Sequence, residues 1–132
     1  MSAATVYNQH MTWLKDQGLY GMVHDVMHRM RTDRRSPPPD RVTFNIAIDA
    51  CGRRDDLDEM ERTLALMREA GIVPDVRTFT SMLSAYARNR QGIQVLDTFE
   101  RFTAMGVRPN ERTYSVLEHW VVPVSVAEGP FA

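Results

Sequence analysis

The stretch RVTFNIAIDACGRRDDLDEMERTLALMREAGIVPD, residues 41–75, decides the fold, because it recurs along the chain at a fixed period. A shift of thirty-five residues places Phe44 on Phe79 and Gly71 on Gly106. Self-similarity at a fixed period of this length is the sequence signature of a repeat architecture. The sequence therefore predicts a protein built from copies of one structural unit.

Each copy contains two apolar stripes with helical spacing. In the copy at 41–75 the first stripe is Phe44, Ala47, Ile48 and Cys51, and the second is Leu57, Met60, Leu64 and Met67. This spacing is the one by which a helix buries a single face. Gly71 then stands where a left-handed residue is needed to end the second helix. The unit is predicted to be a helical hairpin.

The period divides the chain into three complete repeats and the start of a fourth. The predicted boundaries are 4–40 for the first repeat, 41–75 for the second, 76–110 for the third, 111–122 for the first helix of an incomplete fourth, and 123–132 for an irregular tail. The first repeat is two residues longer, and the surplus is assigned to residues 31–39, where three prolines favour an extended loop. About seven helices and no strand are expected.

The sequence VTFN at residues 42–45 and GIVPD at residues 71–75 resemble the pentatricopeptide repeats, whose units begin with VTYN and end with GI-x-PD. The tetratricopeptide repeat is the other candidate, but no copy here has its tryptophan, leucine-glycine and tyrosine signature. The resemblance implies an all-α fold, a right-handed solenoid of helical hairpins with about three and a half repeats. It also implies RNA binding, since helical repeats of this kind read one base per repeat.

The resemblance further implies which residues address an RNA base. In the family, a polar residue near the start of the first helix acts with the last residue of the repeat. The pairs carried over to this chain are Asn8 with Asp40, Asn45 with Asp75, and Thr80 with Asn110. Asparagine with aspartate is similar to the family's uridine reader and threonine with asparagine to its adenosine reader, which implies the order U, U, A. The family also stacks each base on a residue near the start of the first helix, which here implies Val42 and Arg77.

Charge is segregated between the two classes of helix, although the chain as a whole carries only −1. Residues 41–54 hold three arginines and one aspartate, and residues 76–90 hold three arginines and no acid. Residues 55–70, in contrast, hold six acids and two arginines. The first helices of a solenoid share one face, so a basic face and an acidic back are expected. The arginines expected near phosphates are Arg53, Arg54, Arg88 and Arg90.

No motif in the chain composes a catalytic, metal or cofactor site. A nucleophile elbow, a phosphate-binding loop and a cysteine-histidine metal spacing are all absent from the sequence. His24 and His28 stand four apart with an acid after the first, as in the zinc-protease helix motif, but that acid is an aspartate and no third ligand is evident. No apolar run approaches the length of a membrane span. The chain is expected to be a non-enzyme with no metal, no cofactor, no membrane association and no small-molecule substrate.

Two functions remain open at this point. The first is an organellar single-stranded RNA-binding module. Three bases at about 1–3 kcal/mol each, against an association cost of about 4–15 kcal/mol, make three repeats a weak binder, so the module is expected to belong to a longer array or a larger ribonucleoprotein. The alternative is a scaffold subunit of an organellar machine such as a mitochondrial ribosome, which contacts RNA or protein without base reading. The near-neutral charge favours the scaffold, and the intact pairs favour base reading.

The C-terminal end is expected to be a partner surface. Trp120 and the apolar residues of 121–132 follow a helix that lacks its hairpin partner, and exposed apolar residues at the end of a solenoid favour contact with another subunit or with further repeats. The expected partners are single-stranded or ribosomal RNA and other protein subunits. The family's usual address implies a mitochondrion, with a chloroplast as the alternative. The N-terminal MSAATVYNQHM has none of the arginines of a transit peptide, so a targeting segment is expected to be missing from this sequence.

Overall fold

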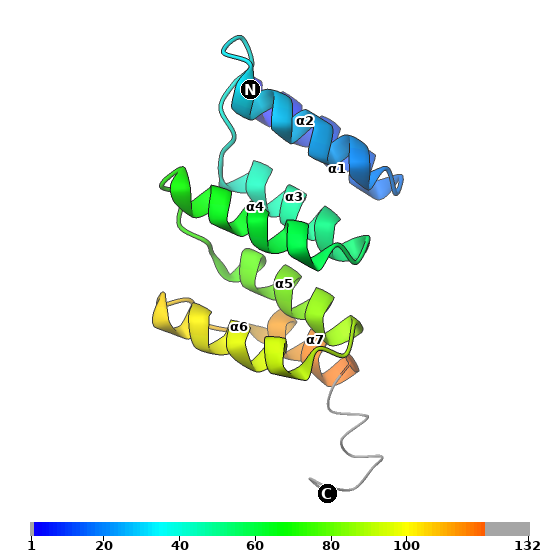
Figure 1. The fold of residues 1–132 in the computed structure, drawn as a ribbon, viewed down its shortest axis with the longest axis vertical. Coiled ribbons are helices and arrows are strands. Elements are labelled where there is room, and N and C mark those ends of the chain that lie inside the picture. The colour runs from blue at the N-terminus through cyan, green and yellow to red at the C-terminus, as the bar shows by residue number, and fades with distance from the viewer. Residues whose placement is uncertain (1, 121–132) are drawn as a thin grey trace, which may run out of the picture. The chain divides into compact units, whose positions relative to one another are not determined.

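A computed structural model describes the backbone of residues 2–120 and the side chains of residues 2–118. This part of the chain folds into helices without a strand (Figure 1). The helices are α1 (Ala3–Asp16), α2 (Tyr20–Thr32), α3 (Arg41–Arg53), α4 (Leu57–Glu69), α5 (Val76–Arg88), α6 (Gly92–Ala104) and α7 (Glu111–Trp120). They form two compact units, the first with α1 to α4 up to Pro74 and the second with α5 to α7 from Asp75 on. None of the described helices combines the length and the apolar character that crossing a membrane requires.

The first unit consists of two helical hairpins. Helix α1 packs on α2 and α3 packs on α4, while α3 also contacts both helices of the preceding hairpin. The buried apolar side chains lie on the predicted stripes and include Met11, Leu14, Val23, Met27, Phe44, Ile48, Met60, Leu64 and Met67. Each fully buried side chain of this size contributes about 1.5–3 kcal/mol relative to an exposed one. The packing of the four helices through these stripes, within and between the hairpins, is therefore the main source of stability in this unit.

The second unit is organised around α5, which packs on both α6 and α7. Phe79 of α5 lies at the centre of its core and is completely buried. Its ring stacks on that of Phe102, with centroids 5.0 Å apart, and meets Phe99 edge to face at 5.2 Å. Aromatic pairs of this geometry contribute about 0.5–1.5 kcal/mol beyond the area they bury. These contacts hold the hairpin of α5 and α6 together.

A capping box starts α3 and α5. In α3, the Asp40 carboxylate accepts the backbone N–H of Thr43 at 3.0 Å, and the Thr43 hydroxyl accepts the backbone N–H of Asp40 at 3.0 Å. The same reciprocal bonds join Asp75 with Thr78 at the start of α5, and Asn110 with Thr113 at the start of α7. A side-chain cap contributes about 0.5–2 kcal/mol to a helix. The last residue of each complete repeat is thus the first structural element of the next one.

The two glycines predicted to end the second helices do so in the left-handed conformation, with φ of +76° at Gly71 and +81° at Gly106. The turn inside each hairpin also needs a left-handed residue, which was not predicted. Gly18 supplies it in the first hairpin, but Asp55 (φ +60°) and Arg90 (φ +57°) supply it in the next two. A side chain in this conformation costs about 1–2 kcal/mol. The hairpin geometry imposes that cost on both residues.

The longer first repeat has a longer connection between hairpins. The segment between α2 and α3 spans residues 33–40, whereas that between α4 and α5 spans residues 70–75. Within it, the Asp33 carboxylate accepts the backbone N–H of Arg35 at 2.9 Å and the Nε–H of the same residue at 3.2 Å. These bonds lower the pKa of Asp33. They give the proline-rich loop a defined turn directly after α2.

The left-handed caps can be tested with two glycines that have equally open surroundings. An added Cβ would meet nothing within 4 Å at Gly106 or at Gly92, but only Gly106 has a positive φ. We expect Gly106→Ala to lower the free energy of unfolding by about 1 kcal/mol. Gly92→Ala, in the first turn of α6, should leave it unchanged or raise it by up to about 1 kcal/mol. Urea denaturation of both variants provides the measurement, and equal effects would contradict the assignment of strain to the backbone.

Candidate nucleic-acid interface

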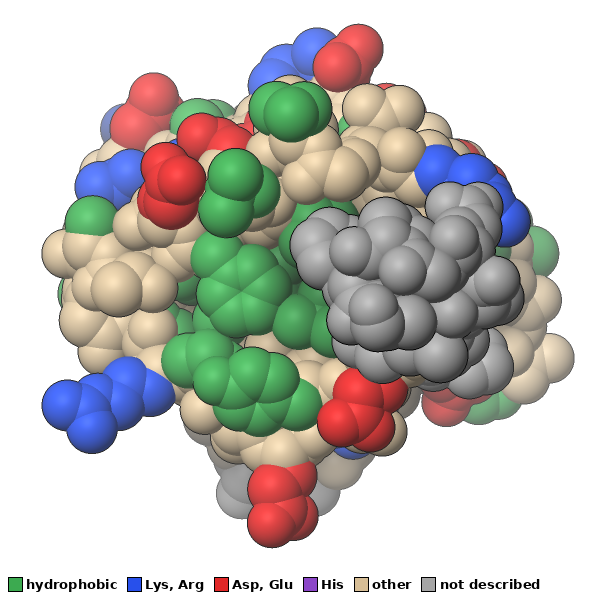
Figure 2. All heavy atoms as spheres, turned by 90° about the horizontal axis from the view of Figure 1, so that it is seen from below, with side chains coloured by type: hydrophobic (Ala, Val, Ile, Leu, Met, Phe, Trp, Pro, Cys, Tyr) green, Lys and Arg blue, Asp and Glu red, His purple; other side chains and the backbone are tan. Residues whose placement is uncertain are grey.

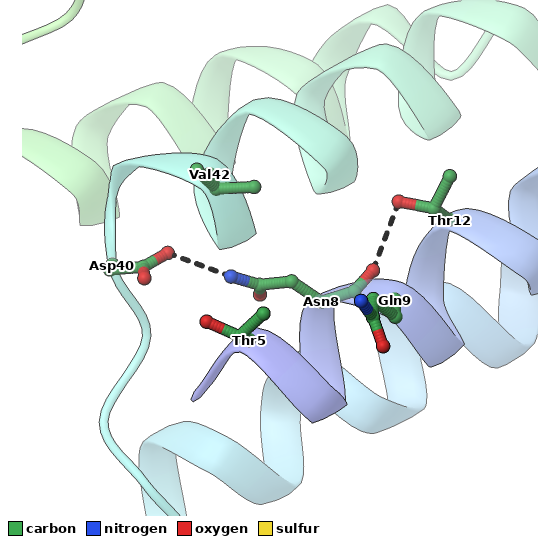
Figure 3. A pocket seen from close by; sticks show the side chains of 6 residues that line it. All are labelled: Thr5, Asn8, Gln9, Thr12, Asp40 and Val42. Atoms are coloured by element: carbon green, nitrogen blue, oxygen red, sulfur yellow. Dashed lines mark hydrogen bonds between the residues drawn. The ribbon is translucent and has the colours of Figure 1, made fainter. Parts of the chain in front are cut away.

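An open groove of about 340 Å³ lies between the start of α1 and the start of α3 (Figure 3). It is lined by Thr5, Asn8, Gln9 and Thr12 from α1 and by Asp40 and Val42 from the start of α3. Three of these residues, Asn8, Asp40 and Val42, were predicted from the sequence to contact a base. The first unit therefore brings the predicted pair of polar readers of the first repeat next to Val42, the stacking residue predicted for the second repeat.

The side chains of Asn8 and Asp40 are bonded to each other. The Asn8 Nδ2–H donates to the Asp40 Oδ1 at 3.0 Å, and the Asn8 Oδ1 accepts the hydroxyl of Thr43 at 2.6 Å. Only 6% of Asn8 is exposed, because it stands on the inner face of α1, one turn before Met11. The pair is fixed in place by the fold, although the sequence offered Asn8 only as a polar residue near a helix start.

Burial tends to raise the pKa of the Asp40 carboxyl, but hydrogen bonds outweigh it. The backbone N–H of Thr43 and the amide of Asn8 donate to the carboxylate and bring its pKa below the ordinary value of 3.8. Hydrogen bonds to an ionised carboxylate are about twice as strong as neutral ones. Asp40 is thus an anionic acceptor at neutral pH.

Val42 projects from the first turn of α3 at the rim of the same groove, and 51% of it is exposed. This side chain leaves apolar area in water, which a bound ligand could cover. It offers a flat apolar contact to a planar ligand in the groove. In the second unit the matching position holds Arg77, which is exposed on the first turn of α5.

The second unit contains the pair Thr80 and Asn110. The hydroxyls of Thr80 and Thr113 are 2.8 Å apart, and the Thr113 hydroxyl donates to the Asn110 Oδ1 at 3.0 Å. The Thr80 hydroxyl also lies 2.8 Å from the carbonyl of Val76. Thr113 therefore joins the two predicted readers through its hydroxyl, as Thr43 does for Asn8 and Asp40. Sequence reasoning did not identify either threonine as part of a site.

The third predicted pair of base readers has one residue in each of the two units. Asn45 is half-buried in α3 of the first unit, and Asp75 is the N-cap of α5 in the second. Their partnership stays a prediction from the sequence register.

The predicted phosphate-contacting arginines of α3 have carboxylate partners. Arg53 Nε lies 2.9 Å from the Asp49 Oδ2, and Lys15 Nζ of α1 lies 2.9 Å from the same atom. Arg54 pairs with Asp56 at 3.3 Å. Burial raises the pKa of Asp49, but Lys15 and Arg53 outweigh this and lower it. Two cations thus share one carboxylate at this end of the first helices, and Lys15 is a cation that sequence reasoning missed.

The arginines predicted for the second unit lie at the C-terminal end of α5. Arg88 is half-buried on its last turn, and Arg90 is exposed in the left-handed turn that follows. Positive charge is favourable there, because the carbonyl end of a helix carries a partial negative charge. The contact of Arg88 and Arg90 with phosphates stays a prediction.

Among the described residues, no three histidines, cysteines or acids gather as a metal site would require. The Nδ1 of His24 lies 3.5 Å from the Oε1 of Glu59, which belongs to α4. Cys51 is a free, buried thiol, and burial raises its pKa. These side chains link and fill the helical hairpins.

Comparison with known families now identifies the repeat. A model described as the PPR repeat family matches residues 39–88, and a second, described as PPR repeat, matches residues 77–107. Together they span more than half of the chain. The chain belongs to the pentatricopeptide repeat family. The all-α fold class predicted from the sequence is confirmed, and helices α1, α2 and α7 lie outside the matched region.

Individual pentatricopeptide repeat proteins match over parts of the chain. A chloroplastic one from Arabidopsis thaliana is 35% identical over 79 residues, which are 60% of this chain and 8% of that protein. A mitochondrial one from the same plant is 29% identical over 77 residues, or 58% of this chain and 12% of that protein. The chain therefore spans about a tenth of the length of these relatives.

A solved pentatricopeptide repeat structure is also similar. PPR10 of maize, in complex with an 18-nucleotide psaJ RNA element, superposes with a TM-score of 0.78 at 27% identity, covering 86% of this chain and 16% of that one. The similarity extends over both units of the present protein.

The predicted partner surface at the C-terminal end rests on Trp120 and residues 121–132, and these lie outside the described side chains. Within the described part of the second unit, Ile93, Leu96 and Tyr114 are large apolar side chains that remain exposed. Figure 2 shows hydrophobic side chains gathered on the face seen from below Figure 1. An apolar cluster of this kind is typical of a contact surface.

The lowered pKa of Asp40 predicts a pH dependence of stability. The carboxylate stabilises the fold above its unfolded pKa, and this contribution is lost as pH falls through the lower pKa of the folded state. We expect Asp40→Asn to be less stable than the wild type at pH 7 by about 0.3–1 kcal/mol, the contribution of a negative charge at a helix N-terminus, with the difference shrinking below about pH 4. Thermal unfolding of both proteins across this range is the measurement. A difference that persists undiminished at acidic pH would refute the role assigned to the ionised carboxylate.

Proposed function

We propose that this chain is an organellar single-stranded RNA-binding module that works as part of a longer repeat array or a larger ribonucleoprotein. The observation that carries the proposal is the groove in which Asn8 and Asp40 are bonded at 3.0 Å beside the exposed Val42. The likeness to the RNA-bound PPR10 supports the same reading. In this role the chain is a binding module and not an enzyme.

The donor and acceptor pattern of the first pair matches uridine. After its bond to Asp40, the amide of Asn8 retains a second N–H, and the carboxylate has more lone pairs than its bonds use. A donor beside an acceptor complements the O4 and the N3–H of uracil on its Watson–Crick edge. Val42 would cover one face of the same base. The Asn45 and Asp75 pair has identical residue types and is proposed to read uridine as well.

The second unit offers the converse pattern at Thr80 and Asn110. The Asn110 Oδ1 is occupied by the N–H and hydroxyl of Thr113, which leaves its amide N–H groups as the donors for a base. The oxygen of Thr80 retains a lone pair. A donor and an acceptor in this arrangement complement N1 and the amino group of adenine. Arg77 is proposed as its stacking residue.

Affinity is proposed to come largely from outside this chain. The relatives are about five to seven times longer than this chain, and a positively charged path along many repeats adds the salt-dependent part of RNA binding. Arg53, Arg54, Arg88 and Arg90 are proposed to contribute to it here. The relatives include chloroplastic and mitochondrial proteins, so an organelle is supported while the choice of the mitochondrion remains a prediction.

The alternative function is a scaffold subunit that contacts protein or ribosomal RNA without reading bases. The exposed Ile93, Leu96 and Tyr114 favour it, as does the net charge of −1. The paired groups at Asn8 and Asp40 favour base reading, because a scaffold has no need for a polar pair held open beside an apolar side chain. Base dependence of binding separates the two functions.

Replacing Asn45 by Thr tests the proposed base reading. If the family's pairing logic holds, Asn45→Thr should shift the preferred nucleotide from uridine toward guanosine at one position, because the hydroxyl changes the pattern offered to the base. The measurement is a titration of the protein with RNA oligomers varied at one nucleotide, with the preference at the Thr80 position as the internal control. Equal affinity for every base, before and after the change, would leave only the scaffold function.

The shared carboxylate of Asp49 gives an electrostatic test. We expect Arg53→Ala to weaken binding to all sequences alike and to flatten the salt dependence, whereas Asp49→Asn should strengthen binding and steepen that dependence, since it releases Lys15 and Arg53 for phosphates. Arg62→Ala is the matched control, because this arginine is paired with Glu59 on α4 at 2.7 Å. An effect of Arg62→Ala equal to that of Arg53→Ala would argue against a phosphate path on the first helices.

A further inference from the structure

One hydroxyl contacts both members of the Asn8 and Asp40 pair. The Thr43 Oγ lies 2.6 Å from the Asn8 Oδ1 and 2.9 Å from the Asp40 Oδ1, and it is completely buried. Thr43 belongs to the capping box of α3, so its position is set by the start of that helix and not by the groove. A residue that begins one repeat thus contacts the readers of the repeat before it.

The second unit repeats this arrangement with different readers. The Thr113 Oγ lies 2.8 Å from the Thr80 Oγ and 3.0 Å from the Asn110 Oδ1. Thr113 is also completely buried, and it holds the matching place at the start of α7. A threonine hydroxyl occupies the same place in both units, although the reader that it contacts is Asn8 in the first unit and Thr80 in the second. The recurrence indicates that the contact belongs to the repeat and not to one asparagine.

The hydrogens of the first set can be counted. The Thr43 hydroxyl accepts the N–H of Asp40 and has one hydrogen to donate. A separation of 2.6 Å between its oxygen and the Asn8 Oδ1 requires a hydrogen between them, and only the hydroxyl can supply it. Once that hydrogen is placed, the contact of 2.9 Å between the Thr43 Oγ and the Asp40 Oδ1 joins two acceptors. The hydroxyl therefore occupies the Asn8 Oδ1, while Asp40 holds one hydrogen of its Nδ2. What remains for the groove is the second Nδ2–H, a donor.

We propose that Thr43 is a specificity-determining residue, which makes Asn8 present a donor and no acceptor to the nucleotide in the groove. The proposal rests on the RNA-binding function proposed above. The O4 of uridine accepts from this donor, whereas the N4 amino group of cytidine meets it with another donor. Thr43 never touches the base. Its hydroxyl acts by occupying the oxygen that would otherwise accept from cytidine.

Loss of the hydroxyl changes the choice between the two pyrimidines. In Thr43→Val the side chain keeps its shape, but the Asn8 Oδ1 becomes a buried acceptor without a donor, which is unfavourable. The amide is then held by its bond to Asp40 alone and can turn its oxygen toward the groove. We expect the preference for uridine over cytidine at this site to fall by roughly fivefold or more, the low end of what one well-placed pair of hydrogen bonds gives.

The test uses the whole chain, isotopically labelled, and titrates it with oligouridine and oligocytidine of equal length at low salt. Because homopolymers remove the question of register, the side-chain amide signals of Asn8 report the nucleotide at this site alone. Thr43→Ser keeps the hydroxyl and should retain the uridine preference. Thr63→Val is the matched control: Thr63 is buried in the same unit, and its hydroxyl donates to the carbonyl of Glu59 in its own helix.

The proposal is supported if Thr43→Val alone loses the preference while Thr43→Ser and Thr63→Val keep it. It is overturned if Thr43→Val binds with the wild-type preference, or if Thr63→Val loses it equally, and in both cases RNA binding itself still stands. If the wild type binds neither oligonucleotide, the proposed function fails and this inference falls with it.

Discussion

The capping box at the start of α3, α5 and α7 is the interaction on which the rest of the structure depends. Asp40, Asp75 and Asn110 each end one repeat and cap the next helix. N-caps strongly favour short side chains with an acceptor oxygen, so this position is restricted to the residue types that can also address a base edge. Folding and the proposed recognition therefore draw on the same few atoms. A change at one of these positions alters helix stability and the groove together.

Most of the fold could be predicted because its determinants are local and periodic. The stripe from Phe44 to Cys51 and the cap at Gly71 follow from helical spacing and from glycine's freedom at positive φ. The left-handed turns at Asp55 and Arg90 could not be predicted in this way, since closure of the hairpin sets their conformation against the preference of the residue. The capping boxes are marked in the sequence by an aspartate or asparagine three residues before a threonine. This pattern is a weaker signal than the usual capping-box sequence, in which a serine or threonine stands three residues before a glutamate.

The candidate site was only partly accessible to sequence reasoning. The resemblance to the pentatricopeptide repeats implied base contacts for Asn8, Asp40 and Val42, and the structure brings the three residues to one groove. Counting charges along α3 did not predict that Asp49 holds Lys15 as well as Arg53, because that ion pair joins two helices that are distant in sequence. The bridging role of Thr43 was missed for the same reason: its partners lie 35 and 3 residues away, and only packing makes them neighbours.

A reading pair that is bonded before any ligand arrives has a consequence for how such arrays work. Side chains that are ordered only on binding cost about 0.5–1.5 kcal/mol each, whereas Asn8 and Asp40 are already fixed by folding. Each repeat can then add a small increment of affinity without a fresh ordering cost. Increments of that kind would accumulate with the number of repeats, while under the proposed recognition buried hydroxyls decide the donor or acceptor character of each site. Affinity and sequence preference would then be separable, because the length of the array would set the first and the polar contacts of Thr43 and its equivalents the second.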